Sequence, residues 1–103
     1  MNAVIRFEDL YNRKINHIQV RGVGVVTGIL NDDLAGRKHQ RFVVELAVHK
    51  TLLILNNIDI WPRVDPLEAG DRVEFCGEYV WNRHGGIVHW IHNDPKSSRD
   101  RAM

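Results

Sequence analysis

Cysteine is scarce in this sequence: Cys76 is the only one, so no disulfide can form within the chain. A lone cysteine fits a reducing compartment. Long apolar runs are also missing, and no stretch approaches the roughly 20 apolar residues that a membrane-spanning helix needs. The first ten residues carry the charges of Arg6, Glu8 and Asp9 and no apolar core of signal-peptide length. We therefore expect a cytoplasmic protein that does not enter a membrane.

An excess of one charge is missing too, because 14 Lys and Arg residues face 13 Asp and Glu residues and the net charge is +1. Bulk charge therefore predicts binding neither to nucleic acid nor to an acidic membrane, and either would need a local patch. Hydrophobic residues make up 44% of the sequence, which is typical of a folded protein. With 103 residues, we predict a single domain over 1–103. It consists of a helix over 3–14, a barrel over 17–93 and a polar tail over 94–103.

The clearest structural signal is a β-hairpin over residues 70–92. Its first strand alternates apolar and polar residues with a period of two, the pattern of a half-buried strand. The apolar residues of one parity are Val73, Phe75, Tyr79 and Trp81. Residues 82–86 are polar and end in two glycines, which is typical of a hairpin loop.

Three more strands are predicted upstream, over residues 17–30, 39–48 and 51–55. A connector over 56–67 contains Pro62 and Pro66, so a regular strand is not expected there. Three strands, a connector and two strands follow the order of a small five-stranded Greek-key barrel of the oligonucleotide/oligosaccharide-binding (OB) type. This is an all-β, mainly antiparallel fold with a short N-terminal helix. The alternative is an open antiparallel sheet or sandwich. A barrel requires the first strand to pair with both the second and the fourth.

The predicted strand over residues 51–55 is apolar on both faces, since Leu53 and Leu55 alternate with Leu52 and Ile54. One face must therefore be covered by something other than the barrel interior. The N-terminal helix could cover it, or a second copy of the chain. We expect a homo-oligomer.

Several segments along the chain resemble a family of short bacterial proteins of unknown function. The resemblance covers about residues 15–95 and rests on these segments: HIQVRGVGVV at 17–26, DD at 32–33, HQRF at 39–42, TLLI at 51–54, NID at 57–59, PRV at 62–64, GD at 70–71, GEY at 77–79, WN at 81–82, GG at 85–86, HW at 89–90 and HNDP at 92–95. The resemblance implies no activity. Similar sequences occur on mobile elements, including integron gene cassettes, so a cassette-encoded protein is expected. Members often carry an export signal and a later Gly-Trp segment, and residues 96–103 depart from that pattern.

Polar and aromatic side chains suited to binding a ligand fall on the first loop, the strand after it and the last hairpin. The predicted ligand-binding residues are Asp33, His39, Arg41, Glu78, Trp81, His89 and Trp90. Arg41 would contact an anion and Trp81 or Trp90 would stack, as in nucleic-acid-binding barrels of this type. Alternatively, the large aromatics fill the core or a subunit interface. The sequence predicts a binding or interaction module rather than an enzyme, with a single-stranded nucleic acid or a protein as partner.

The alternative function is a small hydrolase built from Asp32, Asp33, His39, Arg41 and Glu78. His39 would act as the base and Arg41 would hold the developing negative charge. The other interpretation of these residues is a turn-forming Asp pair, an edge histidine and cross-strand ion pairs.

The six histidines do not follow a recognised metal-site spacing. His89 and His92 are three residues apart, which places them on opposite faces of a strand. The sequence predicts no metal and no cofactor.

Overall fold

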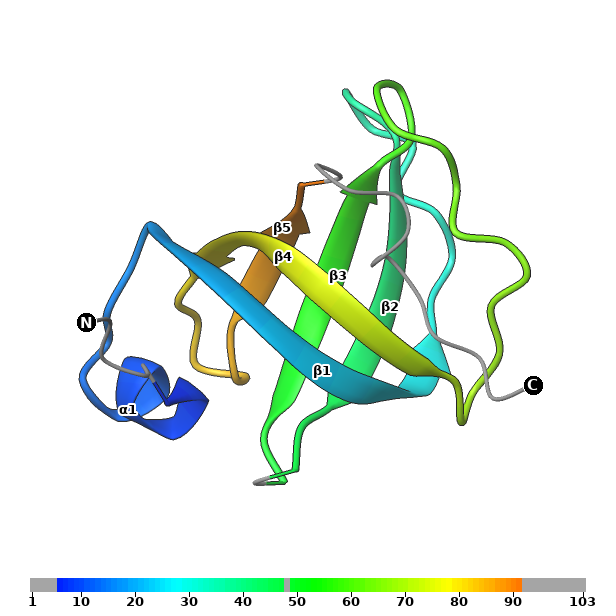
Figure 1. The fold of residues 1–103 in the computed structure, drawn as a ribbon. Coiled ribbons are helices and arrows are strands. Elements are labelled where there is room, and N and C mark those ends of the chain that lie inside the picture. The colour runs from blue at the N-terminus through cyan, green and yellow to red at the C-terminus, as the bar shows by residue number, and fades with distance from the viewer. Residues whose placement is uncertain (1–5, 48, 92–103) are drawn as a thin grey trace.

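The computed structural model describes residues 6–47 and 49–91, which form one short helix and five strands (Figure 1). The elements are α1 (Phe7–Asn12), β1 (Ile18–Ile29), β2 (His39–Glu45), β3 (Thr51–Asn57), β4 (Arg72–Val80) and β5 (Ile87–Trp90). The strands agree with the predicted ones to within a few residues. The polar tail predicted over 94–103 lies outside the described residues.

The five strands close into a ring in the order β1-β2-β3-β5-β4. β1 pairs antiparallel with both β2 and β4, as a barrel requires, and the pairs β2–β3, β3–β5 and β5–β4 complete the ring and exclude an open sheet. β3 and β5 run parallel to each other, and the other neighbouring strands are antiparallel. The predicted all-β, mainly antiparallel OB-like fold with a short helix is confirmed.

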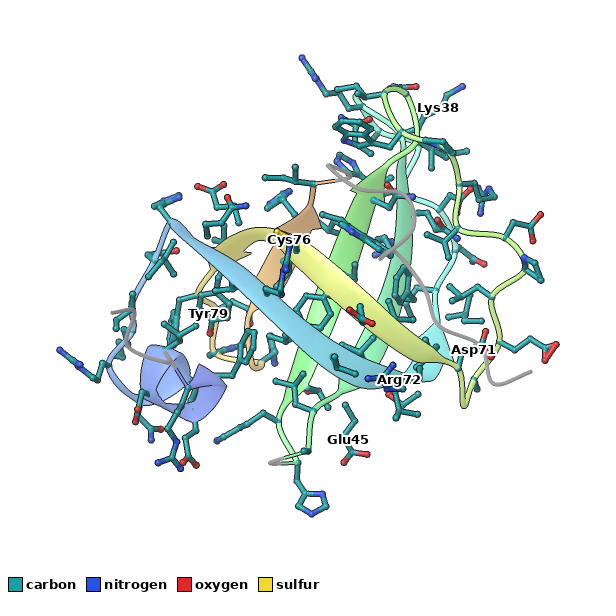
Figure 2. All side chains as sticks on the ribbon, in the orientation of Figure 1. Lys38, Glu45, Asp71, Arg72, Cys76 and Tyr79 are labelled. Carbon is teal, nitrogen blue, oxygen red and sulfur yellow. The ribbon has the colours of Figure 1, made fainter. Side chains whose placement is uncertain are left out.

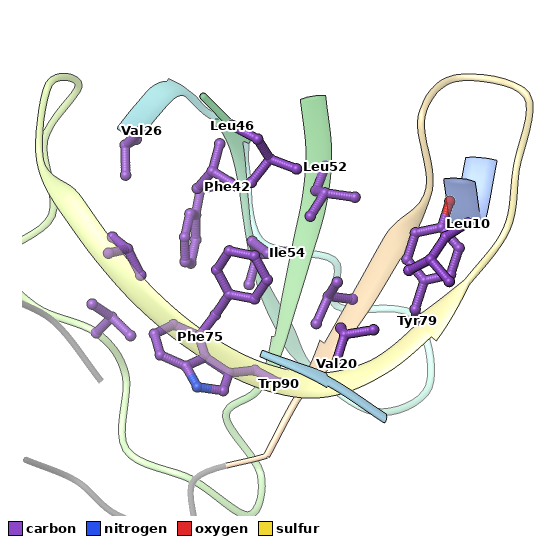
Figure 3. Packing of buried hydrophobic residues seen from close by; sticks show 14 residues of the cluster. Leu10, Val20, Val26, Phe42, Leu46, Leu52, Ile54, Phe75, Tyr79 and Trp90 are labelled. Atoms are coloured by element: carbon purple, nitrogen blue, oxygen red, sulfur yellow. The ribbon is translucent and has the colours of Figure 1, made fainter. Parts of the chain in front are cut away.

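Alternation along each strand sends one set of side chains into the ring and the other to its outer surface. β2 and β3 show this most clearly, with every second residue buried from Gln40 to Val44 and from Leu52 to Asn56. The core includes Phe42, Ile54 and Phe75, all at most 2% exposed (Figure 3). The inward residues of all five strands therefore form one core.

β1 is a long strand that bends around the ring and so pairs with two neighbours. Its glycines allow the bend. The backbone at Gly22 lies under the Phe75 and Phe7 rings, so a side chain there would collide with both. The register with β2 shifts between Val26 and Gly28, a β-bulge that increases local twist. The predicted role of the strand glycines, in bending and close approach, is confirmed at these two points.

One end of the ring, which we call the helix end, is covered by α1 (Figure 1). It contains the start of β1, the turn between β2 and β3 and the loop between β4 and β5. Leu10 of α1 is fully buried. The Phe7 ring forms T-shaped contacts with the Phe75 and Tyr79 rings, and the ring centroids are 6.0 and 6.4 Å apart. The helix spans residues 7–12 rather than the predicted 3–14, of which residues 3–5 lie outside the described part. α1 thus packs over the end of the ring.

The opposite end, which we call the connector end, is covered by residues 58–71 in irregular conformation. Val64 is buried there and belongs to the core. The Gln40 side chain fixes it: Nε2 donates to the Val64 carbonyl at 2.9 Å and Oε1 accepts from the Val64 N–H at 2.9 Å. Buried Asn56 donates to Gln40 Oε1 and to the Pro62 carbonyl, both at 3.1 Å. Side-chain hydrogen bonds therefore hold a segment that has no regular backbone pattern.

Candidate functional site: the outer surface of strands β2, β3 and β5

Two rows of outward side chains cross the three neighbouring strands β2, β3 and β5. We call them the outer strip: Arg41, Leu55 and His89 in one row, and Val43, Leu53 and Ile87 in the other. His89 is exposed and the other five are half-buried. The strip therefore combines an apolar surface with a cation and an imidazole.

His39 and Arg41 lie next to each other on the outer surface of β2, where backbone carbonyls orient both. His39 Nδ1 lies 3.0 Å from the Arg37 carbonyl oxygen. Because a carbonyl only accepts, Nδ1 donates this hydrogen bond and the neutral ring keeps its lone pair on Nε2. Arg41 Nε donates to the Asn31 carbonyl at 2.9 Å. The loop between β1 and β2 thus sets the direction of both side chains.

His89 brings the last strand to the same surface. Its ring meets His39 edge-on with centroids 6.4 Å apart. On its other side His89 pairs with Glu78 of β4, whose carboxylate lies 3.2 Å from His17 Nδ1. Four of the predicted residues, namely His39, Arg41, Glu78 and His89, therefore face outward on neighbouring strands.

Neither predicted tryptophan lies on the outer strip. Trp90 has inward parity, is 5% exposed and meets the Phe42 ring edge-on at 5.9 Å. Trp81 lies at the helix end, where Tyr11 stacks on it at 5.8 Å and Lys14 Nζ lies 5.4 Å from its ring centre. Its indole N–H donates to the Tyr11 carbonyl at 2.9 Å. Both rings pack within the fold, which matches the alternative role that the sequence left open for them.

The carboxylates predicted for a hydrolase do not converge on His39. Asp33 pairs with His39 through the backbone, and its Oδ1 accepts from the Ala35 N–H at 3.1 Å, as in a turn. The Asp32 carboxylate pairs with Arg63. Arg41 and Glu78 are separated by three strand spacings, or about 14 Å. The geometry therefore does not assemble an acid, a base and an anion clamp around one point.

A second group of side chains surrounds a cavity of about 210 Å³ at the helix end. The sequence pattern did not predict that these side chains lie together. We call the cavity the cationic pocket, and it is lined by Tyr11, His49, Lys50, Thr51, Arg83, His84 and Gly85. Its members come from α1, the turn before β3 and the loop before β5, so no local motif joins them. The sequence feature that could have indicated this pocket is two pairs of adjacent basic residues, 49–50 and 83–84, each in a turn.

Among residues 6–47 and 49–91, no three His, Cys, Asp or Glu side chains are grouped to hold a metal ion. No helix in this part of the chain is long and apolar enough to cross a membrane. His92, considered with His89 at the sequence level, lies outside the described residues.

Together the closed ring and its outer strip define a small OB-like barrel with a candidate binding surface. The chain belongs to the family described as Protein of unknown function (DUF3465), whose sequence model matches residues 3–102. This confirms the expected membership of a family of unknown function and extends it beyond residues 15–95. Neither the curated proteins nor the solved structures give a match. The comparisons thus establish the family and assign no ligand or activity.

Proposed function

We propose that the chain is a non-enzymatic binding module that holds a short single-stranded nucleic acid along the outer strip. The strip lies on the β2–β3 surface, which OB-type barrels use to bind oligonucleotides and oligosaccharides. Single-strand binding needs flat or apolar groups under the bases and cations beside the backbone. The strip supplies the first through Val43, Leu53 and Leu55 and the second through Arg41.

The observation that carries this proposal is the pairing register of β2, β3 and β5. It places an apolar row next to the row that contains Arg41 and His89. The outward residues of β3 run from Thr51 to Asn57, a path of about 20 Å at 3.3 Å per residue. Lys38 lies at one end of β2 and Glu45 at the other (Figure 2). A few nucleotides fit along such a path.

Charge argues for a short footprint. The net charge of +1 leaves little excess of positive over negative charge, and on the outer strip only Arg41 is permanently charged. For single strands the slope of log affinity against log salt is about −0.7 per phosphate contacted. We therefore expect a shallow slope of about −0.7 to −1.4, which corresponds to one or two contacts.

Fluorescence anisotropy with labelled DNA and RNA single strands of about ten nucleotides tests the proposal. Arg41→Ala should weaken binding about tenfold, because it removes one charge-assisted hydrogen bond of roughly 1.5 kcal/mol. Arg21→Ala is the matched control, since Arg21 is exposed on β1, across the ring from β3. It should change the affinity by less than about twofold. Equal effects of the two variants, or no binding at about 100 μM and low salt, would overturn the proposal.

A second copy of the chain is the competing occupant of the same surface, because four half-buried apolar residues lie side by side there. They are Val43, Leu53, Ile87 and Val80. Light scattering at high protein concentration separates the two occupants. A dimer that Leu53→Asp dissociates and that excludes nucleic acid would assign the strip to self-association.

A hydrolase is not proposed, because Arg41 and Glu78 are three strands apart and Asp32 and Asp33 have other partners. A bacterial origin, an integron cassette as the source and a cytoplasmic location remain predictions of the sequence. The DNA that flanks the gene and cell fractionation test them.

A further inference from the structure

The cationic pocket contains two permanently charged side chains and two imidazoles, and none of the residues that line it is acidic. Some cations elsewhere on the surface are paired with carboxylates, such as Arg6 with Glu8 and Arg63 with Asp32. Within residues 6–47 and 49–91, no ion pair joins Lys50 or Arg83 to a carboxylate. His49, which also lines the cavity, has its Nδ1 3.5 Å from the Glu45 carboxylate. The positive charge available at the cavity is therefore that of Lys50 and Arg83.

The pocket is held in shape by contacts between its three segments. The Tyr11 hydroxyl donates to the Arg83 carbonyl at 2.8 Å, which ties α1 to the loop between β4 and β5. Lys50 Nζ lies 4.9 Å from the centre of the Tyr11 ring, so the ring orients the cation. Asn82 Oδ1 accepts from the His84 and Gly86 N–H groups, both at 2.9 Å, and fixes the loop.

The cavity also lies where the outer strip ends. Thr51 lines the cavity and is the first residue of β3, and the outward path along this strand continues through Leu53 to Leu55. Leu53 pairs with Ile87, the first residue after the β4–β5 loop. A single-stranded nucleic acid bound along the outer strip would therefore bring one of its termini to the cationic pocket.

We infer that the cationic pocket binds a phosphoryl group, and that in the complex this is the terminal phosphate of the strand. This second part rests on the function proposed above. A cavity of about 210 Å³ is smaller than the roughly 300–1,000 Å³ of pockets that enclose whole drug-sized ligands, and it suits a small anionic group. Lys50 and Arg83 supply the charge and the donors. The imidazoles contact other groups: His49 Nδ1 lies 3.5 Å from the Glu45 carboxylate, and His84 Nε2 accepts from Arg83 Nε at 3.5 Å.

The test compares three single strands of one sequence, with a 5′-phosphate, a 3′-phosphate or no terminal phosphate. For the wild-type protein, a phosphate at one terminus should tighten binding about tenfold, the effect of one or two charge-assisted hydrogen bonds. In the double variant Lys50→Ala, Arg83→Ala this gain should disappear. Lys14→Ala is the matched control, because Lys14 is a cation at the same end that does not line the cavity, and it should keep the gain.

Equal affinity of the three strands, or a phosphate gain that survives in the double variant, overturns the inference and leaves the proposed function intact. Urea denaturation of the double variant verifies that it folds. Both cations are on the surface, so its free energy of unfolding should stay within about 0.5 kcal/mol of the wild-type value for each replacement.

Inorganic phosphate and pyrophosphate separate this inference from the proposed function. Amide chemical shifts at residues 49–51 and 83–85 should move with either anion at millimolar concentration, whether or not strands bind. If either anion moves these amide shifts but no single-stranded nucleic acid binds, the pocket is a phosphoryl site and the protein has a ligand other than nucleic acid. No shift with either anion, together with no terminal-phosphate gain, would remove the site.

Discussion

The two ends of the ring are closed by opposite kinds of chemistry. At the helix end, α1 presents Leu10 and Phe7 to an apolar surface that includes Tyr79, and Figure 3 shows Tyr79 beside Leu10. At the connector end, Gln40 and Asn56 are 4% and 0% exposed and hold the backbone through hydrogen bonds. Apolar contact is non-directional, whereas a buried hydrogen bond fixes which atoms meet.

This difference explains how an irregular segment can be as well placed as a helix. Residues 58–71 lie outside the helix and the strands, and backbone bonds such as that from the Gly70 N–H to the Val26 carbonyl, at 2.7 Å, satisfy only part of their polar groups. Buried side chains satisfy others. Gln40 satisfies both backbone groups of Val64 at once. Among the described residues that are not exposed, no buried side-chain nitrogen or oxygen lacks a hydrogen-bond partner. The connector end therefore depends on a few specific atoms, whereas the helix end combines apolar contact with the hydrogen bonds that join Tyr11 to Arg83 and Trp81.

The largest effect is expected at the helix end, from Leu10→Ala. Leu10 is fully buried, and truncating a buried leucine costs about 2–5 kcal/mol, because apolar area is lost and a cavity is left. Urea denaturation measures the loss in free energy of unfolding. The control Asn12→Ala changes an exposed residue of the same helix and should stay within about 0.5 kcal/mol. A loss below about 1 kcal/mol for Leu10→Ala would mean that α1 does not close the ring.

A smaller but more local effect is expected at the connector end, from Gln40→Ala. It leaves the Val64 N–H and carbonyl without their buried partner, and because water can enter the space that Gln40 leaves, we expect a total cost of about 1–3 kcal/mol. Hydrogen exchange at the Val64 amide should accelerate more than exchange in β2 and β3. Leu10→Ala should not show this selective change. The control Gln19→Ala, on the exposed surface of β1, should leave Val64 protected.

The sequence predicted the features that depend on apolar burial and did not predict those that depend on specific polar contacts. Apolar patterns predicted all five strands, by alternation in β2 and β4 and by a run that is apolar on both faces in β3. The strand order predicted the closed ring, and both follow from which residues must be buried. The helix itself was predictable for the same reason, since Phe7 and Leu10 have helical spacing. Its position over the end of the ring was not, because the sequence offered it as a cover for the outer face of residues 51–55. The Gln40–Asn56–Val64 contacts were not, because a polar residue at an inward position has no sequence signature of its partner. Register and turn geometry decide that partner.

The candidate site shows the same limit. His39 and Arg41 were assigned to one surface correctly, because they are two apart on one strand. The position of Trp90 followed from the register of β4 and β5, where it pairs inward with Gly77. The cationic pocket combines residues 11, 50 and 83, whose proximity is a consequence of ring closure. Side chains that share a strand can be predicted together, and those joined only by topology cannot.

The smallest effect concerns one of the hydrogen bonds at the helix end, that of the Tyr79 hydroxyl. The residue is fully buried and its hydroxyl donates to the Gly85 carbonyl at 3.2 Å. Tyr79→Phe should therefore cost about 1 kcal/mol near neutral pH. If the loss reached the size expected for Leu10→Ala, the helix end would depend on specific hydrogen bonds as much as the connector end does.

The same variant has a pH signature of known sign. Burial, and secondarily the nearby Tyr11, raise the pKa of Tyr79 above its ordinary value of 10.0. Below pH 10 both states keep the phenolic proton, so the contribution to stability is constant. Above it the unfolded chain releases the proton while the folded chain retains it, so the free energy of unfolding falls as pH rises, by up to about 1.4 kcal/mol per pH unit. Urea denaturation from about pH 8 to about pH 11 should show this extra fall in the wild type and in Tyr11→Phe. It should be absent in Tyr79→Phe, and parallel curves for all three proteins would show that the hydroxyl is not desolvated at the helix end.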